Sequence, residues 1–137
     1  MSRKKPGLVI FVSVYMFLYT FFMLFFGLLL LFMPDEEFSL AAIFPSIFLI
    51  GLAILYYKTG RGILRKRNWA KLSATAILGL SFLGGILGLP NAFMIQNVTF
   101  MYALGQLFGI AIGTVLAGIG LHAMAYNQSV QNYFNRE

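Results

Sequence analysis

Residues 8–33 read LVIFVSVYMFLYTFFMLFFGLLLLFM, and no charged residue interrupts them. A membrane-spanning helix needs about 20 mostly apolar residues to cross about 30 Å of hydrocarbon. The stretch therefore predicts a transmembrane helix close to the N-terminus. It is too long for the apolar part of a cleaved signal peptide, and no small-x-small cleavage site follows it. We therefore expect an uncleaved anchor.

Further along the chain, residues 38–57, 72–89 and 98–126 form three more apolar stretches without Asp, Glu, Lys or Arg. Hydrophobic residues make up 60% of the chain and charged residues 10%, which leaves no room for a separate soluble module. The prediction is an all-α integral membrane protein, with its four transmembrane helices in one antiparallel bundle formed by residues 1–137.

Charge is distributed unevenly around these stretches. Basic residues occur at Arg3, Lys4 and Lys5 and throughout residues 58–71, whereas residues 34–37 read PDEE. Because Lys and Arg are retained on the cytoplasmic side during insertion, we expect the N-terminus and the 58–71 loop to be cytoplasmic. The C-terminus then follows on the same side, and the expected location is the plasma (inner) membrane.

The basic loop at 58–71 is the most distinctive segment between the apolar stretches. Its cationic and aromatic side chains predict contact with anionic lipid headgroups on the inner leaflet. The candidate headgroup residues are Lys58, Arg61, Arg65, Lys66, Arg67, Trp69 and Lys71. The same charges also fit a simple topology signal without a ligand. A nucleic-acid partner is not expected, because such a role needs a larger folded surface.

Within this loop, residues 62–71 read GILRKRNWAK. The segment resembles a pattern in small four-helix prokaryotic membrane proteins of unknown function. In that pattern, a glycine, two aliphatic residues and a basic turn precede Asn/Arg-Trp-Ala-Arg/Lys at the start of the third helix. The resemblance implies a four-helix fold and a prokaryotic origin, and it implies no catalytic residue.

Small residues recur at regular spacing in the apolar stretches. Such rows let membrane helices approach closely, since van der Waals packing replaces the hydrophobic drive that lipid cannot supply. The predicted helix-packing residues are Ser81, Gly84, Gly85, Gly88, Gly105, Gly109, Gly113 and Ala117. A second row, Ser13, Thr20 and Gly27, has a spacing of seven and predicts a packing face on the first helix.

Few residues in the sequence suit catalysis or metal binding. Cysteine is absent, and His122 has no Asp, Glu or second His near it in sequence. Asp35 suits a helix N-cap, with Glu36 and Glu37 in the first turn. Pro45 predicts a kink, with a gating hinge as the alternative. We therefore predict no enzyme activity, no catalytic or metal site and no cofactor.

The C-terminal tail, residues 127–137, is mostly polar, and apolar residues recur in it at helical spacing. Tyr126, Val130, Tyr133 and Phe134 fall on one helical face. This predicts either a short amphipathic helix at the membrane surface or a continuation of the fourth helix.

Taken together, the uncharged spans and the glycine rows favour a non-catalytic structural or accessory subunit of a larger membrane complex. Its partners would be membrane lipids and either other membrane subunits or further copies of itself. The alternative is a small homo-oligomeric channel or transporter, although such proteins usually carry ionisable groups within the membrane. An enzyme acting on lipid is the least favoured class.

Overall fold

The computed structural model describes residues 5–32, 40–94 and 99–135. Throughout these residues the regular structure is helical. The helices are α1 (Gly7–Phe32), α2 (Leu40–Leu64), α3 (Asn68–Met94), α4 (Phe100–Tyr126) and α5 (Gln128–Asn135). The predicted N-cap at Asp35 and the acidic residues Glu36 and Glu37 lie outside the described residues.

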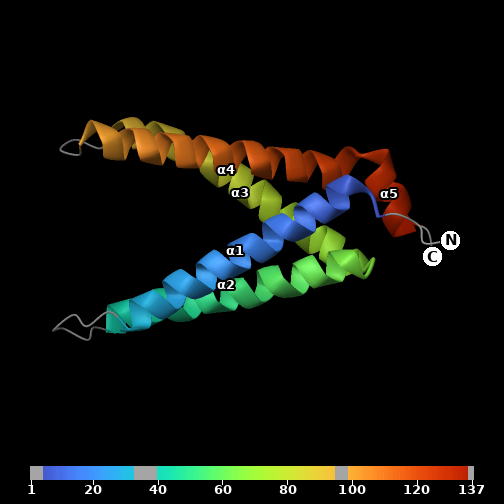
Figure 1. The fold of residues 1–137 in the computed structure, drawn as a ribbon, viewed down its shortest axis with the longest axis horizontal. Helices are drawn as coiled ribbons and strands as arrows, with labels where there is room; N and C mark the ends of the chain where they lie inside the picture. Colours follow the sequence, from blue (N-terminus) through green and yellow to red (C-terminus); the bar gives the residue numbers. More distant parts are fainter. Residues whose placement is uncertain (1–4, 33–39, 95–98, 136–137) are drawn as a thin grey trace. The chain divides into compact units, whose positions relative to one another are not determined.

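Four of the helices, α1 to α4, are long and apolar enough to cross a membrane (Figure 1). The predicted all-α class and the four membrane-spanning stretches are therefore confirmed at this level, and the chain fits a multi-pass membrane protein. The helices form two compact units, Met1–Lys71 and Leu72–Glu137. The first four residues of α3 belong to the N-terminal unit and the rest to the C-terminal unit.

In the N-terminal unit, α1 and α2 lie side by side and run in opposite directions. Glycines allow close approach at two places along the pair. A Cβ added at Gly27 of α1 would lie 3.2 Å from Ile50 Cγ1 of α2. A Cβ added at Gly60 of α2 would lie 3.1 Å from Phe17 Cε1 of α1. The two helices therefore pack closely both near the start of α2 and near its end.

Helix α1 separates its small residues from its bulky ones. Ser13, Thr20 and Gly27 are all buried, as their spacing of seven predicted. The hydroxyls of Ser13 and Thr20 donate to the carbonyl oxygens four residues earlier, at 2.9 and 2.8 Å. In contrast, most of the phenylalanines of α1 are exposed, at positions Phe21, Phe22, Phe25, Phe26 and Phe32. Exposed aromatic side chains of this kind suit contact with lipid.

Helix α2 continues beyond the stretch predicted to span the membrane. The sequence predicted a loop over residues 58–71, but α2 runs on to Leu64 and α3 begins at Asn68. Lys and Arg are good helix formers, so a basic sequence can extend a helix out of the hydrocarbon. The 25 residues of α2 are about 37 Å long, which exceeds the hydrocarbon thickness of about 30 Å. Likewise, α3 continues through Pro90, where the sequence predicted a loop.

In the C-terminal unit, α3 packs against α4 through glycines on both helices. A Cβ added at Gly85 would overlap Thr114 of α4. Cβ atoms added at Gly118 and Gly120 of α4 would lie 3.1 Å from Phe82 and Leu78 of α3. Later residues of α4 therefore contact earlier residues of α3: Thr114 lies beside Gly85, whereas Gly120 lies beside Leu78. These two helices also run in opposite directions.

The junction between α4 and α5 is held by two polar side chains. The Asn127 carboxamide oxygen accepts from the backbone N–H groups of Ser129 and Val130 at 3.0 and 3.3 Å, which caps α5. The Gln131 Nε2 donates to the last carbonyl oxygens of α4, at Met124 and Ala125. Two of the free donors of α5 and two of the free acceptors of α4 are thereby satisfied. The chain turns sharply out of α4 (Figure 1).

The predicted amphipathic tail is a separate helix, α5, and not a continuation of α4. Val130, Tyr133 and Phe134 are buried, but Tyr126 is 76% exposed and does not share their environment. Asn127 interrupts the helix with an extended backbone, φ −71° and ψ 120°, so Tyr126 and α5 do not share one helical register. Burial raises the pKa of the Tyr133 hydroxyl above its ordinary value.

Candidate functional site

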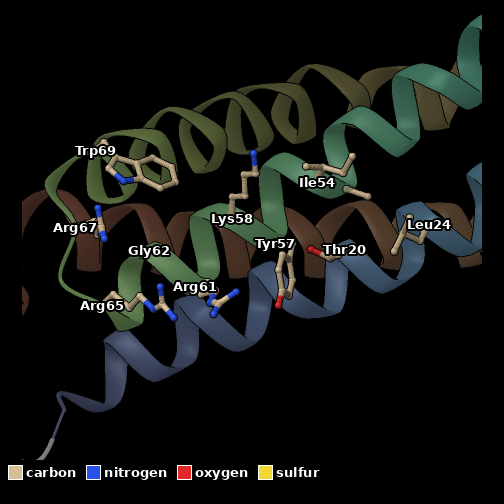
Figure 2. A pocket seen from close by; sticks show the side chains of 11 residues that line it. Thr20, Leu24, Ile54, Tyr57, Lys58, Arg61, Gly62, Arg65, Arg67 and Trp69 are labelled. Atoms are coloured by element: carbon tan, nitrogen blue, oxygen red, sulfur yellow. The ribbon is translucent and has the colours of Figure 1, made fainter.

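A pocket of about 460 Å³ opens on the N-terminal unit, between α1, α2 and the start of α3 (Figure 2). All of its lining residues belong to that unit. They are Thr20, Leu24, Ala53, Ile54, Tyr57, Lys58, Arg61, Gly62, Arg65, Arg67 and Trp69. Thr20, Ala53 and Gly62 are buried and form its floor, whereas the basic side chains and Trp69 are exposed along its rim.

One face of α2 supplies the polarity of this pocket. Ile54, Lys58 and Arg61 follow one another on α2 at intervals of four and three residues. Arg65 directly follows the helix and extends this stripe, because its N–H donates to the Arg61 carbonyl oxygen at 3.2 Å. From Ile54 to Arg65 the stripe covers about 16 Å along the axis. It is apolar at Ile54 and cationic from Lys58 onward. Figure 2 shows Leu24 of α1 beside Ile54, with Arg67 and Trp69 at the opposite end.

The end of α2 is fixed by a compact turn of basic residues. The Arg67 N–H donates to the Gly62 carbonyl oxygen at 2.9 Å, and the Lys66 N–H donates to that of Ile63 at 3.1 Å. This pair of bonds is the Schellman pattern of helix termination. The pattern requires a left-handed backbone conformation at the residue before the last N–H donor. Lys66 adopts this conformation, with φ 57°. A non-glycine residue there costs about 1 kcal/mol or more, so the turn is held against local strain.

Close packing at Gly62 places Trp69 beside the pocket. A Cβ added at Gly62 would lie 2.6 Å from Ala70 Cβ and 3.1 Å from Trp69 Cζ2. No side chain fits there without a shift in the start of α3. Gly62 therefore allows α3 to begin directly against α2, and this contact brings the indole to the rim.

The positive charge of the pocket has no carboxylate near it in the described part of the chain. Every acidic residue of the protein, namely Asp35, Glu36, Glu37 and Glu137, falls outside that part. Like charges three or four residues apart on a helix repel each other by about 0.2–0.5 kcal/mol per pair. The stripe Lys58, Arg61 and Arg65 is therefore a destabilised arrangement that an added anion would relieve.

The structure brings together most of the predicted headgroup residues. Lys58, Arg61, Arg65, Arg67 and Trp69 all line the pocket. Lys66 and Lys71 belong to the same basic segment but do not line it. Whether any of these residues contacts lipid stays a prediction at this point.

Sequence reasoning missed the apolar half of the pocket. Thr20, Leu24, Ala53 and Ile54 come from inside the spans, where they read as ordinary membrane residues. The helical spacing that joins Ile54 to Lys58 was a usable signal. The predicted loop over residues 58–71 concealed this spacing, because it placed Ile54 and Lys58 in different elements.

The predicted packing residues are divided between two environments. A Cβ added at Gly85 would overlap Thr114, one added at Gly88 would lie 4.0 Å from Ile110 Cδ1, and Ala117 is buried. Ser81 and Gly113 are partly buried. Apart from neighbours and the helix's own backbone, no described atom lies within 4 Å of a Cβ added at Gly84, Gly105 or Gly109.

This division has a geometric reason. Residues four apart advance about 40° around a helix with 3.6 residues per turn, so three such steps rotate the row by about 120°. Gly105 and Ala117 consequently cannot share one face of α4. That Gly105, Gly109, Gly113 and Ala117 pack together against another helix stays a prediction.

Groups suited to metal binding do not cluster in the described residues. His122 is exposed, and its ring lies 5.8 Å from that of Tyr126, in a tilted stack. Pro45 lies inside α2, as its position in the second apolar stretch predicted.

Comparison of the chain with known protein families, curated proteins and solved structures gives no match. The resemblance of residues 62–71 to small four-helix prokaryotic membrane proteins stays a prediction.

Proposed function

We propose that this protein is a non-catalytic accessory subunit of a larger membrane complex. In this proposal the two helix pairs associate into one antiparallel four-helix bundle in the plasma (inner) membrane. Both termini and the basic residues at 58–71 are cytoplasmic, following the distribution of Lys and Arg. Partner helices then pack against the small-residue positions that have no described neighbour within their own unit.

The observation that carries the proposal is the open space at Gly84, Gly105 and Gly109. Glycine in a helix interior is about 0.5–1 kcal/mol less favourable than alanine, so it needs a compensating gain. In membranes that gain usually comes from the close approach of another helix. Gly85, Gly118 and Gly120 have such a partner within the C-terminal unit, whereas Gly84, Gly105 and Gly109 have none among its described residues.

The test is purification of the full chain in a mild neutral detergent, followed by mass spectrometry of the intact assembly. We expect stoichiometric co-purification of other membrane subunits. Gly109→Leu should release them, because its side chain fills the space that the partner backbone needs. Val115→Leu on the same helix is the matched control, since Val115 is 59% exposed and already carries a branched side chain.

A small homo-oligomeric channel or transporter is the second candidate. It is supported by Pro45 and Pro90, which lie inside α2 and α3 and remove backbone donors there. Interrupted helices of this kind occur in transporter sites. Purification would then yield a complex of this chain alone. A monomeric species unaffected by Gly109→Leu would contradict both candidates.

A further inference from the structure

We propose that the pocket of the N-terminal unit binds one anionic phospholipid molecule. The phosphate of its headgroup lies among Lys58, Arg61, Arg65 and Arg67, and one acyl chain runs along Ile54 and Leu24. This inference requires only that the helices span a membrane. It does not depend on the accessory role proposed above.

The charge arrangement supports a phosphate ligand. Three of the four bases are arginines, and a guanidinium group can form two parallel hydrogen bonds to a phosphate. Arg61 lies in the last turn of α2, Arg65 directly follows its last residue, and Arg67 directly precedes α3. A ligand between them would be contacted from the end of α2 and from the turn that leads into α3. With no Asp or Glu in the described part of the chain, the countercharge is left to come from outside it.

The apolar end distinguishes a lipid from a soluble anion. Leu24 and Ile54 extend the pocket away from the bases (Figure 2). The stripe changes from apolar to cationic within one turn, between Ile54 and Lys58. A phospholipid has the same change between its acyl chains and its phosphate, whereas a free phosphate has nothing to place against Ile54.

Shape provides the third argument. A basic segment that served only to orient the chain in the membrane would not need a pocket beside it. Here Gly62 brings Trp69 to the rim, and Thr20 and Ala53 leave a hollow between α1 and α2. Trp is favoured at headgroup depth, which is where this ligand would lie.

The experiment uses the full chain in neutral detergent, with lipid binding measured by mass spectrometry of the intact protein. The probes are palmitoyl-oleoyl phosphatidylglycerol, phosphatidylcholine with the same chains, and glycerol phosphate. We expect one phosphatidylglycerol per chain, weaker binding of phosphatidylcholine, and no competition from glycerol phosphate. Equal competition by glycerol phosphate would assign the pocket to a soluble phosphate and overturn the lipid proposal.

Two double variants separate a pocket from general electrostatic attraction. Arg61→Gln/Arg65→Gln removes two charges from the pocket, and we expect phosphatidylglycerol to bind about thirtyfold more weakly. Lys4→Gln/Lys5→Gln removes the same number of charges from the basic residues near the N-terminus, and we expect little change. Equal loss in both variants would mean that the lipid is held only by overall charge.

A third variant tests the apolar end without altering charge. Ile54→Trp should fill the space beside Leu24 and weaken phosphatidylglycerol binding, while circular dichroism shows unchanged helix content. Ile54 is 51% exposed, so the larger side chain can be accommodated without disturbing a packed core. Full binding by Ile54→Trp would contradict the placement of the acyl chain.

Discussion

At the scale of single residues, Gly62 controls the corner between α2 and α3. We expect Gly62→Ala to reduce stability by about 1–3 kcal/mol, because its methyl group would overlap Ala70 and force the start of α3 outward. The chain has one tryptophan, Trp69, so its fluorescence reports the shift directly.

The matched control is Gly51→Ala on the same helix. Nothing lies within 4 Å of a Cβ added at Gly51, and the residue is exposed. This change should be neutral or stabilising by about 0.5–1 kcal/mol, since alanine favours helix more than glycine does. Thermal unfolding in detergent that ranked the two variants in the opposite order would disprove the close contact at Gly62.

Gly84 and Gly85 offer a second comparison between neighbouring residues, for the contact between α3 and α4. Gly85→Ala should destabilise the helix pair by about 1–3 kcal/mol, because its methyl group would overlap Thr114. Gly84→Ala meets no described atom within 4 Å and should leave the pair intact. Helix separation can be followed by the distance between spin labels on α3 and α4, and equal distances in both variants would refute this contact.

At the scale of helices, the two predicted small-residue rows differ in how far they rotate around the helix axis. A spacing of seven returns to within about 20° of the same face, so Ser13, Thr20 and Gly27 stay together over two repeats. A spacing of four advances about 40° at each step, and the error accumulates along α4. Gly118 and Gly120 were missed because neither belongs to the row with a spacing of four.

The boundaries of α2 and α3 were the least predictable part of the fold. The basic residues at 58–71 predict a loop between these helices, yet a helix may continue once it has left the hydrocarbon. The signal that ends α2 is a hydrogen-bond pattern around Lys66 rather than a glycine at the left-handed position. Without glycine there, sequence alone gave no reason to place the turn at residues 65–67.

Helix α5 depends on its cap, which gives a prediction for the C-terminal end. Asn127→Ala removes the side-chain acceptor for Ser129 and Val130 and should destabilise α5 by about 1 kcal/mol. Faster amide hydrogen exchange in residues 128–135 is the expected result. Asn132→Ala is the control, because Asn132 is exposed and lies past the first turn. Unchanged exchange in Asn127→Ala would mean that packing alone holds this helix.

At the scale of the whole molecule, the proposed topology can be tested in a chain that has no natural cysteine. A cysteine at Ser39, just after the acidic residues, should react with an impermeant reagent added from outside the cell. A cysteine at Asn68, the exposed first residue of α3, should react only after the membrane is opened. The reverse pattern would invert every assignment of sides made above.

The sequence determined the helical class and the number of spans because both follow from uninterrupted apolar length. It also identified Lys58, Arg61 and Arg65 as candidate binding residues, since charged residues can be recognised from the sequence alone. It did not reveal the pocket, because Leu24 of α1 and Ile54 of α2 come together only when two separate helices pack. Contacts between distant residues of ordinary type leave no local signal.

The stripe on α2 has a consequence for the kind of membrane in which the pocket works. Its change in polarity between Ile54 and Lys58 must lie at the edge of the hydrocarbon. Lipids with longer or shorter acyl chains move that edge, and a helix answers such mismatch by tilting or by extending its basic side chains toward water. Tilting would change the depth of Arg61 and Arg65, and extension toward water would draw their guanidinium groups out of the pocket. Occupancy of the pocket should therefore be greatest at one bilayer thickness and decline on both sides of it.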